Sequence, residues 1–151
     1  MVVPFTQAEL MAAPVGFRVP MAARFQDVDA AGIVFFARVL EYFHDAYLAF
    51  LADAGQPLPA VLAERRWAAP LRHAEADYLK PIRFGDALEA QLVRARFEGS
   101  TLVVGHRLSA AGDGAALALG TTVHVFVDPA TFRRTDPPAG LLAAFSRLGS
   151  P

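Results

Sequence analysis

Two acidic residues, Asp27 and Asp29, stand directly in front of a long apolar segment in the stretch DVDAAGIVFFARVLEYFHDAYLAFL, residues 27–51. A carboxylate in such a place can attack an activated carbonyl carbon, or it can activate a water molecule for that attack. It can equally cap the free N–H groups at the start of a helix, which is the commoner role of an aspartate there. The residue types alone therefore leave both interpretations open.

The residues that follow the two acids favour a ligand site. Ala30, Ala31 and Gly32 carry little side chain to obstruct a ligand, and glycine permits backbone conformations closed to other residues. The first turn of the predicted helix, around Val34 to Phe36, would present unpaired N–H groups and the positive end of the helix dipole. A carbonyl group placed there would have its developing oxyanion stabilised. A carboxylate and such an amide are the minimum equipment for hydrolysing an activated acyl group.

Several other catalytic machineries are missing from the sequence. There is no G-x-S-x-G nucleophile motif, no glycine-rich phosphate loop and no H-E-x-x-H pair. The four histidines lie far apart in the sequence, and the chain has no cysteine. We therefore expect no metal site and no bound cofactor.

The composition restricts the partners and the location of the chain. With a net charge of −1 and no basic block, the chain is not expected to bind nucleic acid. The longest apolar segment contains Arg38, Glu41, His44 and Asp45, so we expect no membrane span. The lack of cysteine and of a secretory leader pattern favours a cytoplasmic location. Since 54% of the 151 residues are hydrophobic, we expect part of the surface to be buried against another copy of the chain.

The hydrophobic patterns predict one α+β domain over residues 1–151. Helical periodicity runs from about 34 to 54, and Gly55, Pro57 and Pro59 are expected to end this helix. Its apolar arc, which includes Phe36, is so wide that a curved sheet should wrap it. Five strands and a short final helix are predicted from strand-length runs, turn signals and Pro20, which suits an edge strand. The strands are expected at 17–25, 68–79, 86–97, 101–110 and 115–127, the last four as an antiparallel meander, and the final helix at 138–148.

Three segments together resemble a known family. They are the string D-x-D-x-A-G-I-V-F-F-x-x-x-L-x-x-x-H-x-A-Y, the segment APLRHAEADYLKPIRFGDAL and the segment GTTVHVFVDPATFRR. Over roughly residues 17–135 the chain resembles the 4-hydroxybenzoyl-CoA thioesterase family of hotdog-fold enzymes, and within it the 1,4-dihydroxy-2-naphthoyl-CoA thioesterases. The resemblance implies a five-stranded antiparallel sheet around one long central helix. It also implies a homodimer or homotetramer that hydrolyses an acyl-CoA thioester, with an aromatic or a short to medium acyl group, to free acid and CoA.

The family's functional residues carry over to matching positions. Asp29 matches the catalytic aspartate, which acts as nucleophile or as general base, and Asp27 matches an acid that is structural in relatives. The backbone N–H of Phe36 matches the amide that polarises the thioester carbonyl, and Gly32 shapes the turn. His44 falls where relatives place a helix residue that faces the acyl group, although a histidine at a subunit interface is an equally good interpretation.

Other candidates rest on weaker signals. Phe35 and Phe36 suit an aromatic acyl group, but they suit a core as well. His73 lies on a polar strand face that either lines a substrate cleft or meets solvent. Trp67 and Tyr78 are predicted to be packing residues. Basic residues near strand ends hold CoA phosphates in relatives, with ordinary surface charge as the alternative, and the candidates here are Lys80, Arg83, Arg133 and Arg134.

Two other functions compete with hydrolysis. A hotdog hydratase or dehydratase needs a histidine beside its acid, in a D-x-x-x-x-H pattern, but the fifth residue after Asp29 is Val34. A non-catalytic acyl-CoA-binding domain is the second alternative, and it would give Asp29 no evident purpose.

Overall fold

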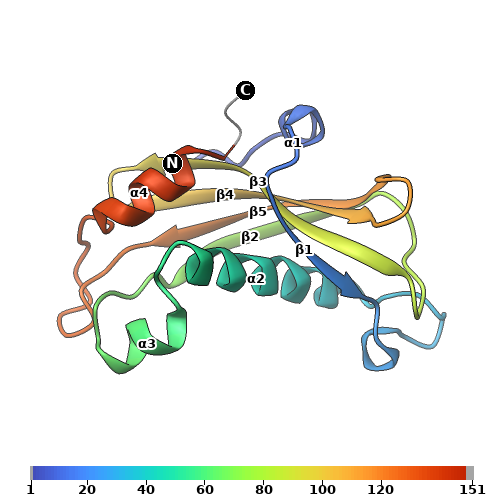
Figure 1. The fold of residues 1–151 in the computed structure, drawn as a ribbon, viewed down its shortest axis with the longest axis horizontal. Coiled ribbons are helices and arrows are strands. Elements are labelled where there is room, and N and C mark those ends of the chain that lie inside the picture. The colour runs from blue at the N-terminus through green and yellow to red at the C-terminus, as the bar shows by residue number, and fades with distance from the viewer. Residues whose placement is uncertain (1, 149–151) are drawn as a thin grey trace.

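A computed structural model of the chain describes residues 2–148 and shows five antiparallel strands that curve around one long helix, α2 (Figure 1). This confirms the predicted α+β architecture. The predicted domain also includes residue 1 and residues 149–151, which lie outside the described part of the chain. The strands are β1 (Phe17–Ala22), β2 (Leu71–Tyr78), β3 (Ala87–Glu98), β4 (Thr101–Ala110) and β5 (Ala116–Val125). The helices are α1 (Gln7–Ala12), α2 (Phe36–Asp53), α3 (Leu58–Ala63), α4 (Ala139–Ser146) and a 3-10 turn, η1 (Phe25–Asp27).

The strand order β1-β3-β4-β5-β2 corrects part of the predicted topology. Strands β3, β4 and β5 do form an antiparallel meander, but β2 pairs with β5 at the far edge of the sheet and not with β3. The KPIRFG segment is therefore no hairpin turn. It lies against the residues in front of α2, where Val34 N–H donates to the carbonyl of Ile82 (2.7 Å) and Ile33 pairs with Arg83. These contacts carry the chain from one edge of the sheet toward the other.

The two edges of the sheet are β1 and β2. Pro20 lies in β1, which pairs with β3 alone, so the predicted edge strand is confirmed. Strand β1 ends at Ala22, before the predicted residue 25, because the chain turns into η1. Strand β2 has only β5 as a neighbour, and most of its residues are exposed. Its free edge therefore carries unpaired backbone groups.

Two short helices were not predicted. Helix α1 begins at a capping box in which Thr6 Oγ1 accepts from Glu9 N–H (3.2 Å) and Thr6 N–H donates to Glu9 Oε2 (2.7 Å). Helix α3 begins at Leu58, directly after Pro57, and has Pro59 in its first turn, where a missing N–H costs nothing. Pro57 and Pro59 thus start a new helix after Gly55, which has a φ of 79° just beyond the end of α2.

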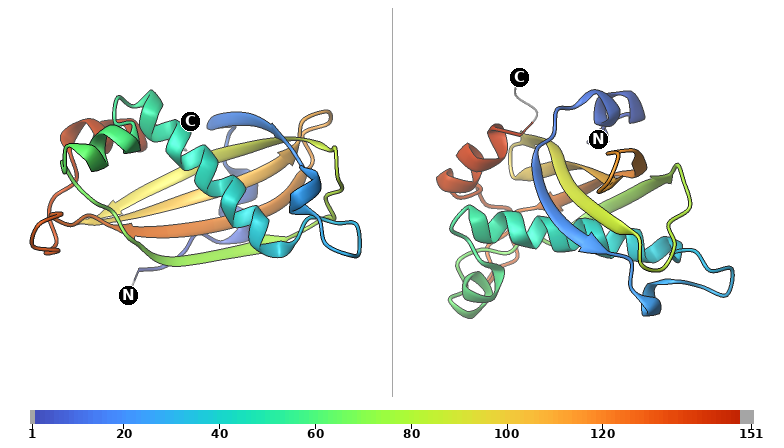
Figure 2. Two further views of the ribbon diagram at one scale, coloured as in Figure 1. Left: turned by 90° about the horizontal axis from the view of Figure 1, so that it is seen from below. Right: turned by 45° about the vertical axis from the view of Figure 1, so that its right-hand side comes forward.

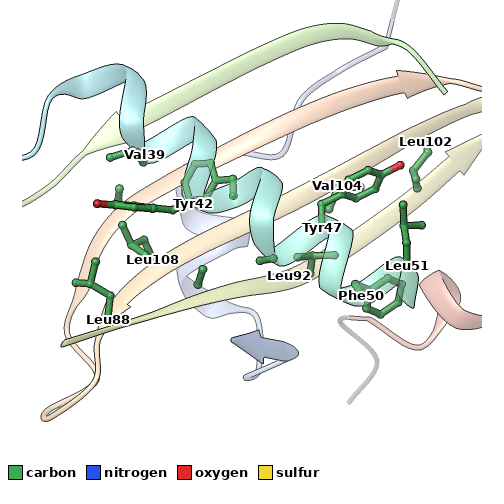
Figure 3. Packing of buried hydrophobic residues seen from close by; sticks show 14 of the residues in the cluster. Val39, Tyr42, Tyr47, Phe50, Leu51, Leu88, Leu92, Leu102, Val104 and Leu108 are labelled. Carbon is green, nitrogen blue, oxygen red and sulfur yellow. The ribbon is translucent and has the colours of Figure 1, made fainter. Parts of the chain in front are cut away.

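The main core lies between α2 and the sheet. Figure 3 shows Val39, Tyr42, Tyr47, Phe50 and Leu51 of the helix pointing into a layer of strand residues. The strand residues labelled there are Leu88, Leu92, Leu102, Val104 and Leu108. Phe36, which the helical pattern placed in the apolar arc, remains 61% exposed.

A second, smaller core covers the opposite face of the sheet. Helix α1 packs there with Phe5 and Leu10 against strand residues such as Val103 and Leu119, and Figure 2 shows α1 and α2 on opposite sides of the sheet. The buried guanidinium of Arg107 donates to the carbonyls of Leu10 (3.0 Å) and of Ala13 (2.9 Å), at the end of α1. Both faces of the sheet are therefore partly covered, and this accounts for much of the apolar composition.

We predict that Gly120→Ala destabilises the protein by about 1–3 kcal/mol, the usual cost of overpacking. An added Cβ at Gly120 would lie 2.5 Å from Phe43 Cε2 and 2.6 Å from the backbone oxygen of Glu75, so α2 would have to move away from the sheet. Gly112→Ala is the matched control, because nothing lies within 4 Å of a Cβ there. Urea denaturation measures both changes. Equal stabilities for the two variants would contradict the packing argument.

Candidate active site

A tight loop places Asp29 in front of α2. The N–H of Asp29 donates to the carbonyl of Ile33 (2.9 Å), and the N–H of Gly32 donates to the carbonyl of Asp29 (2.9 Å). Gly32 has a φ of 80°, which closes a three-residue loop in the conformation that glycine adopts most easily. The sequence DAAG thus forms a rigid turn.

The carboxylate of Asp29 is exposed and nearly free of partners. Its Oδ1 accepts a hydrogen bond from Ala31 N–H (2.8 Å), and no other partner of this side chain occurs within residues 2–148. Neither acid caps α2, because the residue that precedes this helix, Phe35, makes no side-chain capping bond and neither carboxylate reaches the first turn. The helix-capping interpretation of the two acids is therefore wrong for α2.

The first turn of α2 has an unpaired backbone amide close to Asp29. Phe36 is the first helical residue, and its N–H has no acceptor among the described residues. Asp29 and Phe36 both line a cleft of about 440 Å³, together with Phe35 and Lys80. Phe35 and Phe36 are exposed, and their ring centroids lie 4.6 Å apart. The alternative that these two rings belong to the core is therefore excluded.

Tyr78 is a further candidate site residue, which the sequence patterns did not indicate. It was predicted to be a packing residue, but it is 49% exposed, lines the cleft beside Asp29, and its hydroxyl donates to the carbonyl of Phe36 (2.8 Å). This bond spans 42 positions of the chain and joins the free edge strand β2 to the start of α2. Only the strand pairing could have indicated it.

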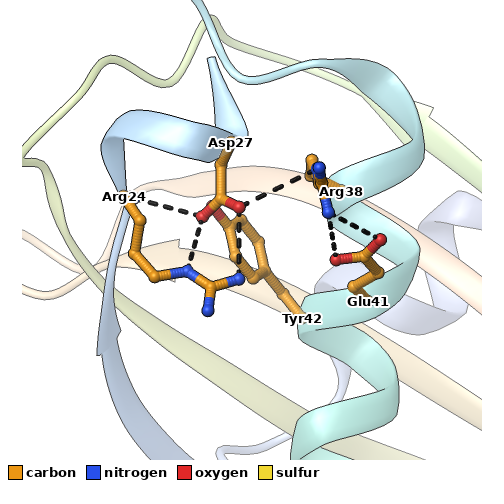
Figure 4. A network of polar contacts seen from close by, with 5 residues as sticks. All are labelled: Arg24, Asp27, Arg38, Glu41 and Tyr42. Atoms are coloured by element: carbon orange, nitrogen blue, oxygen red, sulfur yellow. Dashed lines mark hydrogen bonds and ion pairs between the residues drawn. The ribbon is translucent and has the colours of Figure 1, made fainter.

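Asp27 has the opposite surroundings from Asp29 (Figure 4). Its carboxylate is fully buried and accepts hydrogen bonds from Arg24 Nε (3.0 Å), Arg24 N–H (3.1 Å) and the Tyr42 hydroxyl (2.6 Å). Arg38 Nε lies 3.9 Å away. Burial alone would raise the pKa of Asp27, but the bonds from Arg24 and Tyr42 outweigh it, so the pKa lies below its usual value. This carboxylate is a charged structural anchor.

A larger cleft of about 710 Å³ lies beside the middle of α2, between this helix, α3 and β2. The predicted substrate residue His44 is exposed and lines it, as does the buried Trp67, whose indole N–H donates to Gln56 (3.2 Å). The two clefts border the same stretch of helix, since Val39 lines the smaller one and Leu40 the larger one.

Two buried histidines that were not predicted as site residues line the deep side of the larger cleft. His106 Nε2 lies 2.9 Å and His124 Nε2 lies 3.1 Å from the hydroxyl oxygen of Thr122. Phe43 stacks on His106, and Tyr47 stacks on His124. Burial lowers the pKa of His106 to about 3 and the pKa of His124 to about 4, so both imidazoles are neutral near pH 7.

Among the other predicted residues, Arg83 pairs with Ile33 close to Asp29, whereas His73, Arg133 and Arg134 do not line the cleft of Asp29 in the single chain. His73 pairs with Val123, which faces α1, so His73 lies on the other face of the sheet, where it contacts Glu75 (3.1 Å). Arg133 and Arg134 follow β5, and Arg134 lines a small surface hollow with Ser100 and Asp136. Their roles in substrate binding remain predictions.

Among residues 2–148, no group of three or more histidine, aspartate or glutamate side chains is arranged to hold a metal ion. No helix in this range is long and apolar enough to cross a membrane.

Comparisons with known proteins identify close relatives. A family model of the thioesterase-like superfamily matches residues 23–145. The chain is 36% identical over 119 residues to a 1,4-dihydroxy-2-naphthoyl-CoA hydrolase of Synechococcus elongatus. The aligned region covers 78% of this chain and 86% of the relative. A protein of the same name from Acaryochloris marina is 32% identical, over 82% of this chain and 91% of the relative. The crystal structure of a 1,4-dihydroxy-2-naphthoyl-CoA thioesterase from Synechocystis superimposes with a TM-score of 0.81 at 26% identity, covering 89% of this chain and 98% of that one.

We predict that the protein loses stability as the pH falls from 6.5 to 5. In this range the unfolded chain binds protons at histidines with a pKa near 6.5, while folded His106 and His124, with pKa values of about 3 and about 4, stay neutral. Protonation therefore favours unfolding. The free energy of unfolding should therefore fall as the pH falls, with a slope set by the number of extra protons that the unfolded chain binds. Replacing His106 by leucine removes one of these proton-binding groups and should reduce the slope by up to about 1.4 kcal/mol per pH unit.

Urea denaturation at several pH values within this window measures the slope. Unfolded carboxyl groups titrate near pH 4, below the window, and contribute little to it. An identical slope in wild type and His106→Leu would show that His106 is not held neutral.

Proposed function

The chain belongs to the thioesterase-like superfamily, and from this premise we propose that it hydrolyses an aromatic acyl-CoA thioester with Asp29 and the Phe36 amide as its catalytic groups. Membership in this superfamily, with relatives named as hydrolases and thioesterases, makes the chain an acyl-CoA thioesterase of the hotdog fold. The matched curated relatives are named for 1,4-dihydroxy-2-naphthoyl-CoA, so this thioester is the first substrate to test.

One observation carries the assignment of the catalytic groups. A nearly free carboxylate and an unpaired helix N-terminal amide line the same cleft of about 440 Å³. The thioester carbonyl oxygen would accept the Phe36 N–H bond, with the helix dipole adding to the stabilisation of the oxyanion. Asp29 would then attack the carbonyl carbon and expel CoA thiolate, leaving an anhydride for water to cleave, or it would deprotonate a water molecule that attacks. Both routes give the free acid and CoA.

The surface around this cleft favours a site completed by a second copy of the chain. The clefts are bordered by exposed apolar side chains, which a monomer would leave in water. They are Phe35, Phe36, Leu62, Leu71, Tyr78, Leu79 and Phe132. The free edge of β2 runs between them and offers unpaired backbone groups to another strand.

A two-fold pairing of β2 edges would bring the two arginines after β5 in one chain close to the catalytic cleft of the other chain. Two copies of one edge strand that continue a single sheet run antiparallel, so the Leu71 end of one would meet the Tyr78 end of the other. The Leu71 end carries Phe132, next to Arg133 and Arg134, and the Tyr78 end carries Asp29 and Phe36. In such a dimer the two arginines of one protomer would approach the catalytic cleft of its partner, as a site for CoA phosphates requires.

We predict that Asp29→Asn lowers kcat for 1,4-dihydroxy-2-naphthoyl-CoA by at least ~10²-fold, because asparagine can neither attack the carbonyl nor accept a proton from water. Its thermal stability should change little, since the carboxylate is exposed and makes one hydrogen bond. Release of free thiol from the substrate measures kcat.

The matched control is Asp27→Asn, two residues away. It removes a buried charge that holds Arg24 and should cost about 1–3 kcal/mol of stability while the folded enzyme keeps most of its kcat. Wild-type rates in Asp29→Asn would refute the catalytic assignment, and an inactive wild type would refute the choice of substrate.

We predict that the protein is a dimer or larger assembly through the β2 edge, and that Leu71→Glu shifts it toward monomers with reduced activity. Leu71 is 57% exposed in the single chain, so the protomer should still fold, while a pair of glutamates would be buried at the interface. Met11→Glu, at a similarly exposed residue of α1, is the control and should leave assembly unchanged. Sedimentation velocity at micromolar concentration reports the assembly. A wild-type monomer with full activity would exclude a two-chain site.

A further inference from the structure

A threonine hydroxyl is shared by two buried imidazoles in the larger cleft. Thr122 on β5 lies within hydrogen-bonding distance of His106 on β4 (2.9 Å) and of His124 on its own strand (3.1 Å). His106 is fully buried, and its second nitrogen, Nδ1, has no partner among the described residues. Thr122 itself is only half-buried and lines the cleft. Within this cluster the threonine hydroxyl is therefore the most accessible polar group, while the exposed His44 lines the same cleft.

The protons of this cluster can be assigned from its neighbours. His124 uses Nε2 toward Thr122, so its hydrogen bond to the backbone of Ala69 places its proton on Nδ1. His124 Nε2 must then accept the hydroxyl proton of Thr122. Because that proton is used, His106 Nε2 must donate to the Thr122 oxygen. A hydroxyl oxygen has two lone pairs, so one lone pair of Thr122 remains for a ligand.

The remaining lone pair selects the chemistry of the ligand. It can accept a hydrogen bond from an O–H group, but the cluster has no donor left for a carboxylate. Both imidazoles stay neutral near pH 7, because burial lowers the pKa of His106 to about 3 and that of His124 to about 4. An anionic group placed against Thr122 would lose hydration without gaining a hydrogen-bond donor from this cluster. A neutral hydroxyl group can donate to the remaining lone pair of Thr122.

The surrounding walls fit an aromatic ring. Side chains of Tyr47, Trp67 and Leu58 line the cleft, whose volume of about 710 Å³ lies within the usual range for small-molecule sites. Along α2, Phe36 and Val39 line the cleft of Asp29, whereas Leu40, His44 and Tyr47 line the larger cleft, which therefore lies further from the start of the helix. A ring in the larger cleft would thus extend away from the reacting carbonyl.

We propose that Thr122, held by His106 and His124, is a specificity-determining residue that accepts a hydrogen bond from a ring hydroxyl of the acyl group, remote from the thioester. This inference rests on the proposed function and names the residue that would contact the ring hydroxyl.

The test compares two thioesters that differ in one hydroxyl, 1,4-dihydroxy-2-naphthoyl-CoA and 1-hydroxy-2-naphthoyl-CoA. The wild type should show the higher kcat/KM with the dihydroxy substrate. Thr122→Val keeps the shape of the side chain but removes its oxygen, and it should lower the ratio of the two kcat/KM values by about tenfold, the usual worth of one hydrogen bond. Thr122→Ser, which restores the hydroxyl, should recover the ratio, a result that a purely structural role would not produce.

Thr121→Val is the matched control. Thr121 is the next residue of β5, and it is buried on the other side of the sheet with a hydroxyl that has no partner among the described residues. Its loss should leave the ratio unchanged. If Thr122→Val fails to fold, Thr122→Ala and Thr122→Ser make the same comparison.

Two outcomes overturn the proposal and can be told apart. If the wild type hydrolyses both substrates and Thr122→Val leaves their ratio unchanged, Thr122 does not contact the hydroxyl, while the proposed hydrolysis stands. If the wild type hydrolyses neither substrate, the proposed function fails and this inference fails with it.

Discussion

A fully buried carboxylate, that of Asp27, joins the chain segments that meet at the start of α2. Its side chain holds Arg24 and the hydroxyl of Tyr42, and its carbonyl accepts the N–H of Phe35, the residue before the helix (2.8 Å). A charge buried this deeply tolerates no loss of its partners, so the turn and the helix are fixed relative to one another. Val28 is extended and joins Asp27 directly to Asp29. Anchoring Asp27 therefore fixes the start of the loop that holds Asp29 at the cleft.

The sheet adds a second constraint, because only one of its two edge strands is free of proline. Strand β1 carries Pro20, which cannot donate a hydrogen bond to another strand, and this discourages pairing at that edge. Strand β2 has no proline, and Tyr78 at its end bonds to the first residue of α2. Tyr78 of the free edge, the exposed rings of Phe35 and Phe36 and the catalytic candidate Asp29 therefore line one cleft. A partner chain on that side would cover apolar surface and approach the candidate site at once.

Patterns that depend on neighbouring residues were readable from the sequence, and those that depend on distant pairing were not. The long helix and the five strands follow from periodicity, turn residues and Pro20. The placement of β2 beside β5 could not be read, because it depends on contacts of Ile82 and Arg83 with the residues before α2. Tyr78 and Thr122 were missed for the same reason, since their partners come from other elements. Helix α1 did have a local signal, the Thr6–Glu9 capping box, and it was overlooked.

The two clefts offer different surroundings to the proposed substrate. The carboxylate of Asp29 is exposed and accepts one backbone hydrogen bond, so water reaches it. An aromatic ring is held best where water is excluded, and there each unpaired polar atom is costly. His106, Thr122 and His124 meet this condition by remaining neutral and bonding to one another. Their cluster places one oxygen in an apolar cleft without placing a charge there. Along α2, the residues that line the cleft of Asp29 precede those that line the larger cleft, so one rigid helix fixes how the two clefts lie relative to one another.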